Sequence, residues 1–243
     1  MEIKRIAKLF TAFWSRHWDV LVVLALIFAM VIAFAWQHNV STALSPYEAS
    51  VANRLLASYA AVPPGGCDRD LATIVRCVHK AQDIVWDNVA PKGGIPMGYR
   101  RGIAELLKWK KGRCYDRSRA IEDLLVAMHL TVRHVSIYQD SLFAGSDKYS
   151  HALTEVKTPQ GWMVVGSLSK WVGLLPGGRP VSMSYIAQHG IAAFAPQPIR
   201  PRAKKILSGK FAYVYGLYSR HGKFYPPYDR VPDVNWNQLL DNL

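Results

Sequence analysis

An uncharged apolar segment close to the N-terminus is the strongest constraint on how this chain folds. Residues 20–36, VLVVLALIFAMVIAFAW, contain no charged side chain. A stretch of this length is at the short end of what a helix needs to cross a bilayer, and it is long for the apolar part of a signal peptide. Tryptophans stand at both edges, as interfacial anchors do: Trp14, Trp18 and Trp36. The segment therefore predicts a transmembrane helix over residues 20–36.

Basic residues before this segment predict its orientation. Residues 1–19 carry Lys4, Arg5, Lys8 and Arg16, and an excess of Lys and Arg marks the cytoplasmic side of a span. We expect residues 1–19 in the cytoplasm and the remainder of the chain outside it. A cleaved signal peptide is the alternative, because Ala33–Ala35 (AFA) fits a small-x-small cleavage site.

The net charge of the chain indicates which classes of partner it can bind. The formal net charge is +13, which favours contact with an anionic polysaccharide or with lipid headgroups, or simply a solvated basic surface. The sequence contains no nucleic-acid motif, and an exported domain does not meet nucleic acid. We therefore expect no nucleic-acid partner.

The three cysteines fall into a pair and a single residue. Cys67 and Cys77 lie close together in GGCDRDLATIVRC, and Cys114 stands alone. Because an exported domain occupies a compartment that permits disulfides, we predict a Cys67–Cys77 bridge and an odd thiol at Cys114. Three reduced, buried cysteines are the alternative.

The order of periodic segments predicts an α+β domain. Helical spacing covers residues 46–61, 69–89, 103–110 and 114–129, with Gly112 as a C-cap. Alternating, β-branched segments follow at 131–138, 151–158 and 162–168, which indicates an antiparallel meander. The predicted organisation, listed by residue range, is a basic segment at 1–19, an anchor at 20–36, a helical lead-in at 37–104, a core at 105–190 and a Pro- and aromatic-rich extension packed on the domain at 191–243.

The stretch KKGRCYDRSRAIEDLL places Cys114 where a helix is predicted to begin. A helix N-terminus and basic neighbours stabilise a thiolate and lower the pKa of the thiol. Thiol catalysis also needs a base, and His151 at the start of a predicted strand is the best-placed histidine. Asp116 and Arg117, just after the cysteine, are expected on the helix surface, and a contact with substrate is the alternative. A buried, inert core thiol is the alternative reading of Cys114.

Three short motifs together resemble the transglutaminase-like cysteine enzyme superfamily: GRC at a helix start, HALTEV at the head of a strand and GW before the next strand. This resemblance implies a papain-like core of helices packed on an antiparallel sheet. It implies Cys114 as the nucleophile and His151 as the general base. The family has an aspartate where this chain has Gly166, so the group that orients the imidazole is missing from its usual place.

Several arrangements of the active site are compatible with glycine at position 166. Glu155 is one candidate for the orienting acid, because it shares a strand face with His151, and Asp140 or Asp147 in the preceding loop are others. A Cys–His dyad without a third member is a further option, since that member chiefly fixes the tautomer and ring orientation. The last option is an inactive site on a fold kept for binding.

The resemblance leads to one functional hypothesis and one alternative. The first is a transglutaminase-like cysteine hydrolase, anchored in a bacterial inner membrane with its catalytic domain in the periplasm, that acts on amide bonds of an envelope protein or peptide through an acyl-thioester. Processing of exopolysaccharide or of surface proteins is the expected setting. The alternative is an inactive binding module for an envelope polysaccharide or assembly protein. No cofactor is expected, and no Cys/His spacing matches a zinc site.

Overall fold

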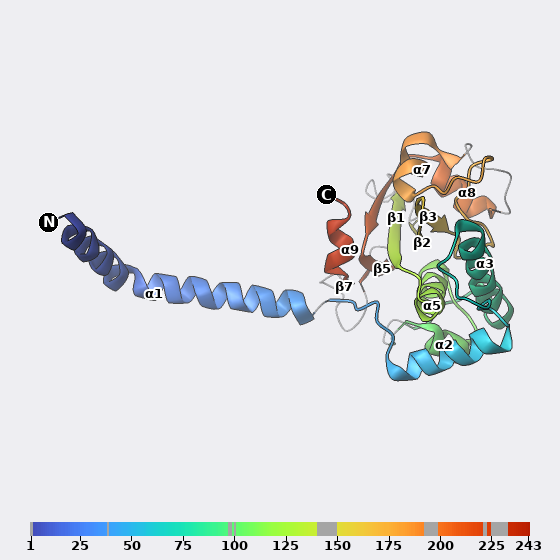
Figure 1. The fold of residues 1–243 in the computed structure, drawn as a ribbon, viewed down its shortest axis with the longest axis horizontal. Coiled ribbons are helices and arrows are strands. Elements are labelled where there is room, and N and C mark those ends of the chain that lie inside the picture. Colours follow the sequence, from blue (N-terminus) through green and yellow to red (C-terminus); the bar gives the residue numbers. More distant parts are fainter. Residues whose placement is uncertain are drawn as a thin grey trace. The chain divides into compact units, whose positions relative to one another are not determined.

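The computed structural model describes residues 2–37, 39–96, 99, 101–139, 150–191, 199–220, 223–224 and 233–243. The chain divides into two compact units, Met1–Asn39 and Val40–Leu243. Figure 1 shows the elements of both units along the chain.

The first unit is a single helix, α1 (Glu2–Gln37). Its part from His17 to Trp36 is long and apolar enough to cross a membrane. This finding agrees with the predicted span over residues 20–36. A signal sequence has the same properties, so the cleaved alternative stays open.

The second unit begins with four helices whose ends follow from local sequence. They are α2 (Pro46–Ser58), α3 (Leu71–Asn88), α4 (Ile103–Trp109) and α5 (Cys114–Ala127). Ser45 and Glu48 form a capping box at the start of α2, and Asp70 caps α3 by accepting from the backbone N–H of Thr73. Such caps satisfy backbone donors that have no partner inside the helix.

The C-cap predicted at Gly112 is wrong. Helix α4 ends at Trp109, and its C-cap is Lys110, which lies two residues before Gly112 and adopts the left-handed conformation (φ 48°). Gly112 is required for a different reason: a Cβ there would lie 2.4 Å from Cδ1 of Leu106. The glycine therefore allows α4 to approach the start of α5 closely.

Four antiparallel strands form the main sheet, in the order β3-β2-β1-β4. The first three strands are the predicted meander: β1 (Val132–Gln139), β2 (Ser150–Thr158) and β3 (Gly161–Val165). The fourth, β4 (Phe211–Tyr215), comes from the C-terminal extension and pairs with β1. A smaller sheet of order β6-β5-β7 contains β5 (Leu217–Arg220), β6 (Lys223–Phe224) and β7 (Asp233–Val234).

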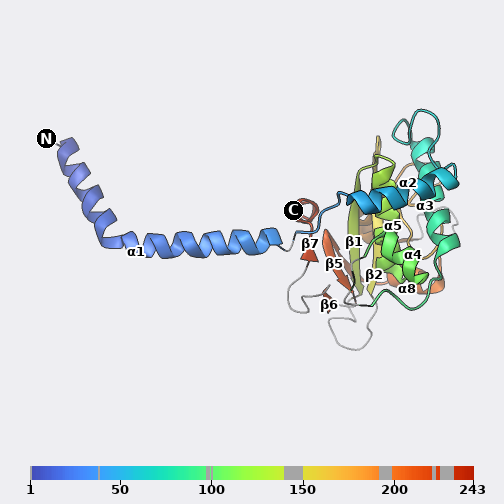
Figure 2. The same cartoon turned by 90° about the horizontal axis from the view of Figure 1, so that it is seen from below.

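Helices cover both faces of the main sheet. On one face, α5 packs on β1 and β2, and α2, α3 and α4 pack on α5, as Figure 2 shows from below. On the other face, α7 (Met183–His189) and α8 (Pro201–Ser208) bury apolar side chains against Val135, Leu153 and Val164. This three-layer arrangement is the α+β fold class predicted from the sequence.

The two ends of the second unit meet. The backbone N–H of Val40 donates to the carbonyl of Val234 at 2.7 Å, and Asn235 donates through Nδ2 to the carbonyl of Val40, also at 2.7 Å. Asn235 in turn caps α9 (Trp236–Leu240). The C-terminal extension is therefore part of the domain, through one strand of the main sheet and through these contacts.

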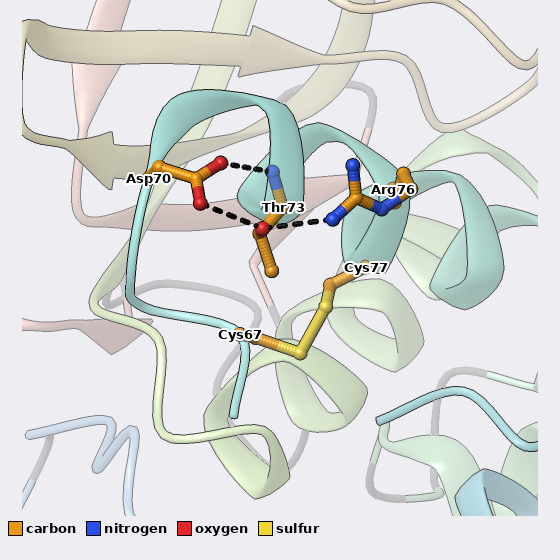
Figure 3. The surroundings of a disulfide bond; sticks show 5 residues. All are labelled: Cys67, Asp70, Thr73, Arg76 and Cys77. Carbon is orange, nitrogen blue, oxygen red and sulfur yellow. Dashed lines mark hydrogen bonds between the residues drawn. A yellow bond between two sulfur atoms is a disulfide. The ribbon is translucent and has the colours of Figure 1, made fainter. Parts of the chain in front are cut away.

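A disulfide joins Cys67 to Cys77, as predicted, with an S–S distance of 2.10 Å and a Cα–Cα distance of 6.1 Å. Figure 3 shows that it connects the segment before α3 to the helix itself, beside a chain of hydrogen bonds from Asp70 through Thr73 to Arg76. Both sulfurs are buried in the core of the helical layer. The bridge therefore holds the loop between α2 and α3 against α3.

Replacing both bridged cysteines with serine is expected to lower the free energy of unfolding. Closing a loop of this size stabilises a protein by about 2–3 kcal/mol through the unfolded chain. Urea unfolding of the full chain in detergent, followed by tryptophan fluorescence, would measure the loss. Thiol counting on the denatured, unreduced wild type should find one free thiol; three would contradict the bridge.

Candidate active site

Cys114 is the first residue of α5, and it is buried. It is the one cysteine outside the disulfide among the three in the chain. Its Sγ lies at the end of the helix where backbone N–H groups have no helical acceptor and where the helix dipole favours negative charge. This position suits a thiolate.

Asp116 fixes the first turn of α5. Its Oδ2 accepts from the backbone N–H of Arg113 at 3.0 Å and of Ile95 at 3.3 Å, and its Oδ1 lies 3.3 Å from Nε of Arg101. The carboxylate therefore ties the loop before α4 to the helix start that carries Cys114. The prediction that Asp116 and Arg117 lie on the helix surface is wrong, because both side chains are fully buried by such partners.

His151 is the second residue of β2 and pairs with Ile137 of β1. The sheet register brings it to the pocket that contains Cys114. The residues lining this pocket come from the start of α5 and from facing positions of β1 and β2: Cys114, Tyr115, Ser136, Tyr138, Ser150, His151 and Ala152. A thiol and an imidazole thus share one small pocket, and their catalytic roles stay a prediction.

Glu155 has other partners. Its Oε2 lies 2.6 Å from Nη2 of Arg133, and its Oε1 accepts from the backbone N–H of Met183 and from the hydroxyl of Tyr215. Glu155 is not one of the described residues that line the Cys114 pocket. Burial raises the pKa of Glu155 above its ordinary value despite the neighbouring Arg133. Its contacts favour a structural role, anchoring α7 and β4 to β2, over the predicted orientation of His151.

The other acids considered for that role, Asp140 and Asp147, lie outside the described residues. No group of three or more His, Cys, Asp or Glu side chains that could hold a metal ion occurs in the described part of the chain.

Gly166 leaves no room for an aspartate. A Cβ at this position would lie 2.4 Å from Cδ1 and Nε1 of Trp171 and 2.6 Å from the carbonyl of Ser169. The turn is closed by a hydrogen bond from the N–H of Gly166 to the carbonyl of Trp171, and Gln82 donates to both Gly166 and Trp171 carbonyls. The buried indole therefore occupies the space that a side chain would need.

An apolar residue stands beside the pocket instead. Leu168, just after this turn, packs on a buried cluster made of Cys114, Tyr115, Ala152 and Tyr218. Tyr218 comes from β5 in the C-terminal extension, which the motifs do not include. Sequence motifs could not have indicated either contact, because both depend on how segments distant in the chain come together.

A buried polar network lies one to two turns along α5 from Cys114. Glu122 accepts from Nδ1 of His134 at 2.7 Å and from Nη1 of Arg119 at 2.6 Å, and Thr154 donates to it at 3.2 Å. The ring of His134 stacks on Tyr218, with centroids 4.4 Å apart. Burial alone would raise the pKa of Glu122, but His134 and Arg119 hold it below its ordinary value.

Asp123 belongs to the same buried region. Its Oδ2 accepts from the N–H of Ile103 at 2.8 Å, and its Oδ1 lies 3.8 Å from Nη2 of Arg119. Burial is the main cause that raises the pKa of Asp123 to about 7, against the opposing effect of Arg119. The carboxyl therefore connects α5 to the start of α4 and takes up a proton near neutral pH.

Residues 72–167, from α3 to just beyond β3, match the family model of the transglutaminase-like superfamily. The match is to the superfamily that the motifs resemble, and it includes α3 as well as the segment from Cys114 to β3. No curated protein matches the chain.

Among solved structures, a protein from Cytophaga hutchinsonii provisionally assigned as a cysteine protease matches with a TM-score of 0.39 and 16% identity. The match covers 52% of this chain and 40% of that chain.

Replacing Gly166 with alanine is expected to destabilise the domain by about 1–3 kcal/mol, because the added methyl group must displace Trp171. Gly166→Asp should be worse and should not supply an orienting acid. Gly177→Ala is the matched control, since a Cβ there meets no atom within 4 Å. Urea midpoints measure the effect, and equal midpoints for Gly166→Ala and Gly177→Ala would contradict it.

Stability should fall as pH rises towards neutrality. A folded pKa of about 7 for Asp123, above its ordinary value of 3.8, means that between these two pH values the native state holds a proton that the unfolded state has released. The resulting stabilisation is complete below about pH 4 and is lost as pH rises to about 7. Asp123→Asn should reduce this loss by about 1–3 kcal/mol between pH 5 and 8.

Unfolding midpoints measured across that pH range would test the effect of Asp123. The exposed Asp68→Asn variant serves as the control for removal of one carboxylate. Identical pH slopes for wild type and Asp123→Asn would show that this carboxyl does not take up a proton on folding.

Proposed function

We propose that this chain is a cysteine hydrolase of amide bonds that works through an acyl-thioester on Cys114. The observation that carries the proposal is that Cys114, at the N-terminus of α5, and His151, at the start of β2, line the same pocket. The superfamily match of residues 72–167 supports the same chemistry.

The reaction follows from the roles of the two side chains. His151 accepts the thiol proton, and the thiolate attacks the amide carbonyl, so that a C–S bond forms. When the C–N bond breaks, the imidazolium returns the proton to the leaving amine. Water then attacks the thioester with His151 as base, which releases a carboxylic acid and restores the thiol.

Two features around Cys114 favour its thiolate form. The N-terminus of α5 contributes the positive end of the helix dipole. The guanidinium of Arg117, one turn further along the helix, is buried among carbonyl groups and adds a positive charge. These features would compensate in part for the missing acid that orients the imidazole in the family.

The setting that we propose is the bacterial cell envelope. The segment His17–Trp36, apolar enough to span a membrane, would anchor the protein in the inner membrane, and the basic residues before it would keep the N-terminus in the cytoplasm. The Cys67–Cys77 disulfide is consistent with a periplasmic domain. Envelope proteins or peptides would be the substrates, with exopolysaccharide or surface-protein processing as the wider role.

A binding module without activity is the second candidate, and the turn at Gly166 favours it. Trp171 fills the position of the usual acid and Leu168 packs beside Cys114. Under this alternative the same pocket would bind a segment of an envelope polymer or assembly protein without cleaving it.

Thiol reactivity distinguishes the two functions. At pH 6 iodoacetamide should alkylate Cys114 about tenfold faster than it alkylates glutathione, because an activated cysteine is largely thiolate at this pH. His151→Gln should remove this advantage. His189→Gln, which changes an exposed histidine at the end of α7, should leave the rate unchanged.

Mass spectrometry of the labelled protein gives the rate for Cys114 directly, because the other two cysteines are bridged. A Cys114 that reacts no faster than glutathione, or that is unaffected by His151→Gln, would favour the binding module.

A further inference from the structure

Among the described residues of the second unit, four arginines are buried, and three of these have carboxylate partners. Arg101 pairs with Asp116, Arg119 with Glu122 and Asp123, and Arg133 with Glu155 and Asp241. The fourth, Arg117, is the most deeply buried at 1% exposure. Within the described parts of the chain, it has no carboxylate partner.

Arg117 is held by neutral groups. Its Nε donates to the carbonyl of Ser167 at 2.9 Å, and its Nη1 donates to the carbonyl of Val89 at 2.6 Å. Its Cζ lies 5.2 Å from the ring centroid of Trp86. A buried charge is normally paired because its desolvation is costly. This guanidinium is therefore a fixed positive charge without a counter-ion among the residues described.

Two more cations surround the same indole. Cζ of Arg200 lies 5.1 Å from the ring centroid of Trp86, and Nζ of Lys170 lies 6.0 Å from it. Asp83 pairs with Lys170 at 2.6 Å and balances one of the three charges. Arg200 has no carboxylate partner in the described part of the chain. Arg117, Arg200, Lys170 and Trp86, referred to below as the Trp86 cluster, therefore carry excess positive charge.

The cluster combines a buried charge with an accessible one. Arg117 is inaccessible, whereas Arg200, Lys170 and Trp86 are half-buried and reach the surface. Burial, together with the charge of Arg200, lowers the pKa of Arg117 to about 10. The guanidinium stays protonated at neutral pH, and the two arginines repel each other as long as no anion lies near them.

We propose that the Trp86 cluster binds an oxyanion, a carboxylate or phosphate group. Arg200 would bind the anion directly, since a guanidinium presents a donor fork that matches both groups. Arg117 would add its charge from behind the surface, where water screens it little. Trp86 keeps the cations in place through cation–π contacts.

The cluster is connected to the candidate active site. Arg117 follows Cys114 by one turn of α5, and Ser167, whose carbonyl it binds, donates through Oγ to the carbonyl of Ala152 at 2.7 Å. Ala152 lines the Cys114 pocket. We therefore assign the cluster to an acidic group of the substrate, a role that rests on the proposed hydrolase function; binding of the anion does not depend on it.

Calorimetric titration of the full chain in neutral detergent tests the site. Sodium phosphate and sodium glucuronate are the two probes, with ionic strength held constant by NaCl. We expect saturable binding of at least one probe. Arg200→Gln should weaken it fivefold or more, and Arg179→Gln, which removes an exposed arginine above another aromatic ring, should change it less than twofold.

Preference between the two probes identifies the ligand as a carboxylate or a phosphate. If neither probe binds saturably, or if Arg200→Gln and Arg179→Gln bind equally well, the proposal is overturned. If Arg200→Gln lowers the unfolding midpoint, Lys170→Gln replaces it as the test variant, because it removes another charge of the cluster. Lys170→Gln should then weaken probe binding fivefold or more.

A titration of Cys114→Ala separates this proposal from the hydrolase function. Anion binding should persist within twofold in this variant, because the cluster does not include the thiol. Persistent binding together with an unreactive Cys114 would mean that the site exists on a non-catalytic module. Loss of binding in Cys114→Ala would mean that the anion occupies the thiol pocket and would overturn the assignment to the Trp86 cluster.

Discussion

Burial of α5 on all sides is the constraint on which the rest of the domain depends. Every residue from Cys114 to Leu125 is buried, although a helix buried all round is normally apolar. The charged residues of α5 are accommodated because each has polar partners. Arg119 pairs with Glu122 and Asp123 of the same helix, and the other four also bind groups on neighbouring elements. Asp116 binds the loop before α4, and Asp123 binds the start of α4. Arg117 binds the end of α3 and the turn after β3. Glu122 binds the side chain of His134 in β1. One helix thus sets the position of most elements around it.

The same interactions determine where the thiol lies. Because the first turn of α5 is fixed by Asp116 and the sheet register is fixed by pairing of β1 with β2, Cys114 and His151 reach one pocket from elements separated in the chain. The position at which the superfamily has its aspartate differs in this chain. There, Gly166 permits Trp171 to pack, and Leu168 meets the Cys114 cluster. An indole therefore fills the place where the superfamily motif implies an aspartate. In the proposed hydrolase, His151 would have to be oriented by a group other than an acid at this position.

Much of the fold could be predicted from the sequence because its signals are local. Helical spacing, N-caps such as Asp70, and β-branched alternation act within a few residues of each other, and they placed the helices and the three-stranded meander to within a few residues. The predicted pairing of Cys67 with Cys77 rested on short separation and on export. The prediction for Gly112 failed because glycine serves two purposes, helix capping and close approach, and a single sequence does not distinguish them.

The candidate site was predictable only in its two motif residues, Cys114 and His151. The sequence by itself determined the apolar segment near the N-terminus, the excess of positive charge, and the order of helix, strand, turn and strand that places a thiol at a helix start. Only the tertiary structure decided that Glu155 pairs with Arg133, that Arg117 is buried without a carboxylate among the described residues, and that an indole fills the space beside Gly166. These outcomes depend on which side chains meet across β-strands and helices far apart in the chain. Charge pairing and steric exclusion depend on these tertiary contacts and cannot be read from single residues.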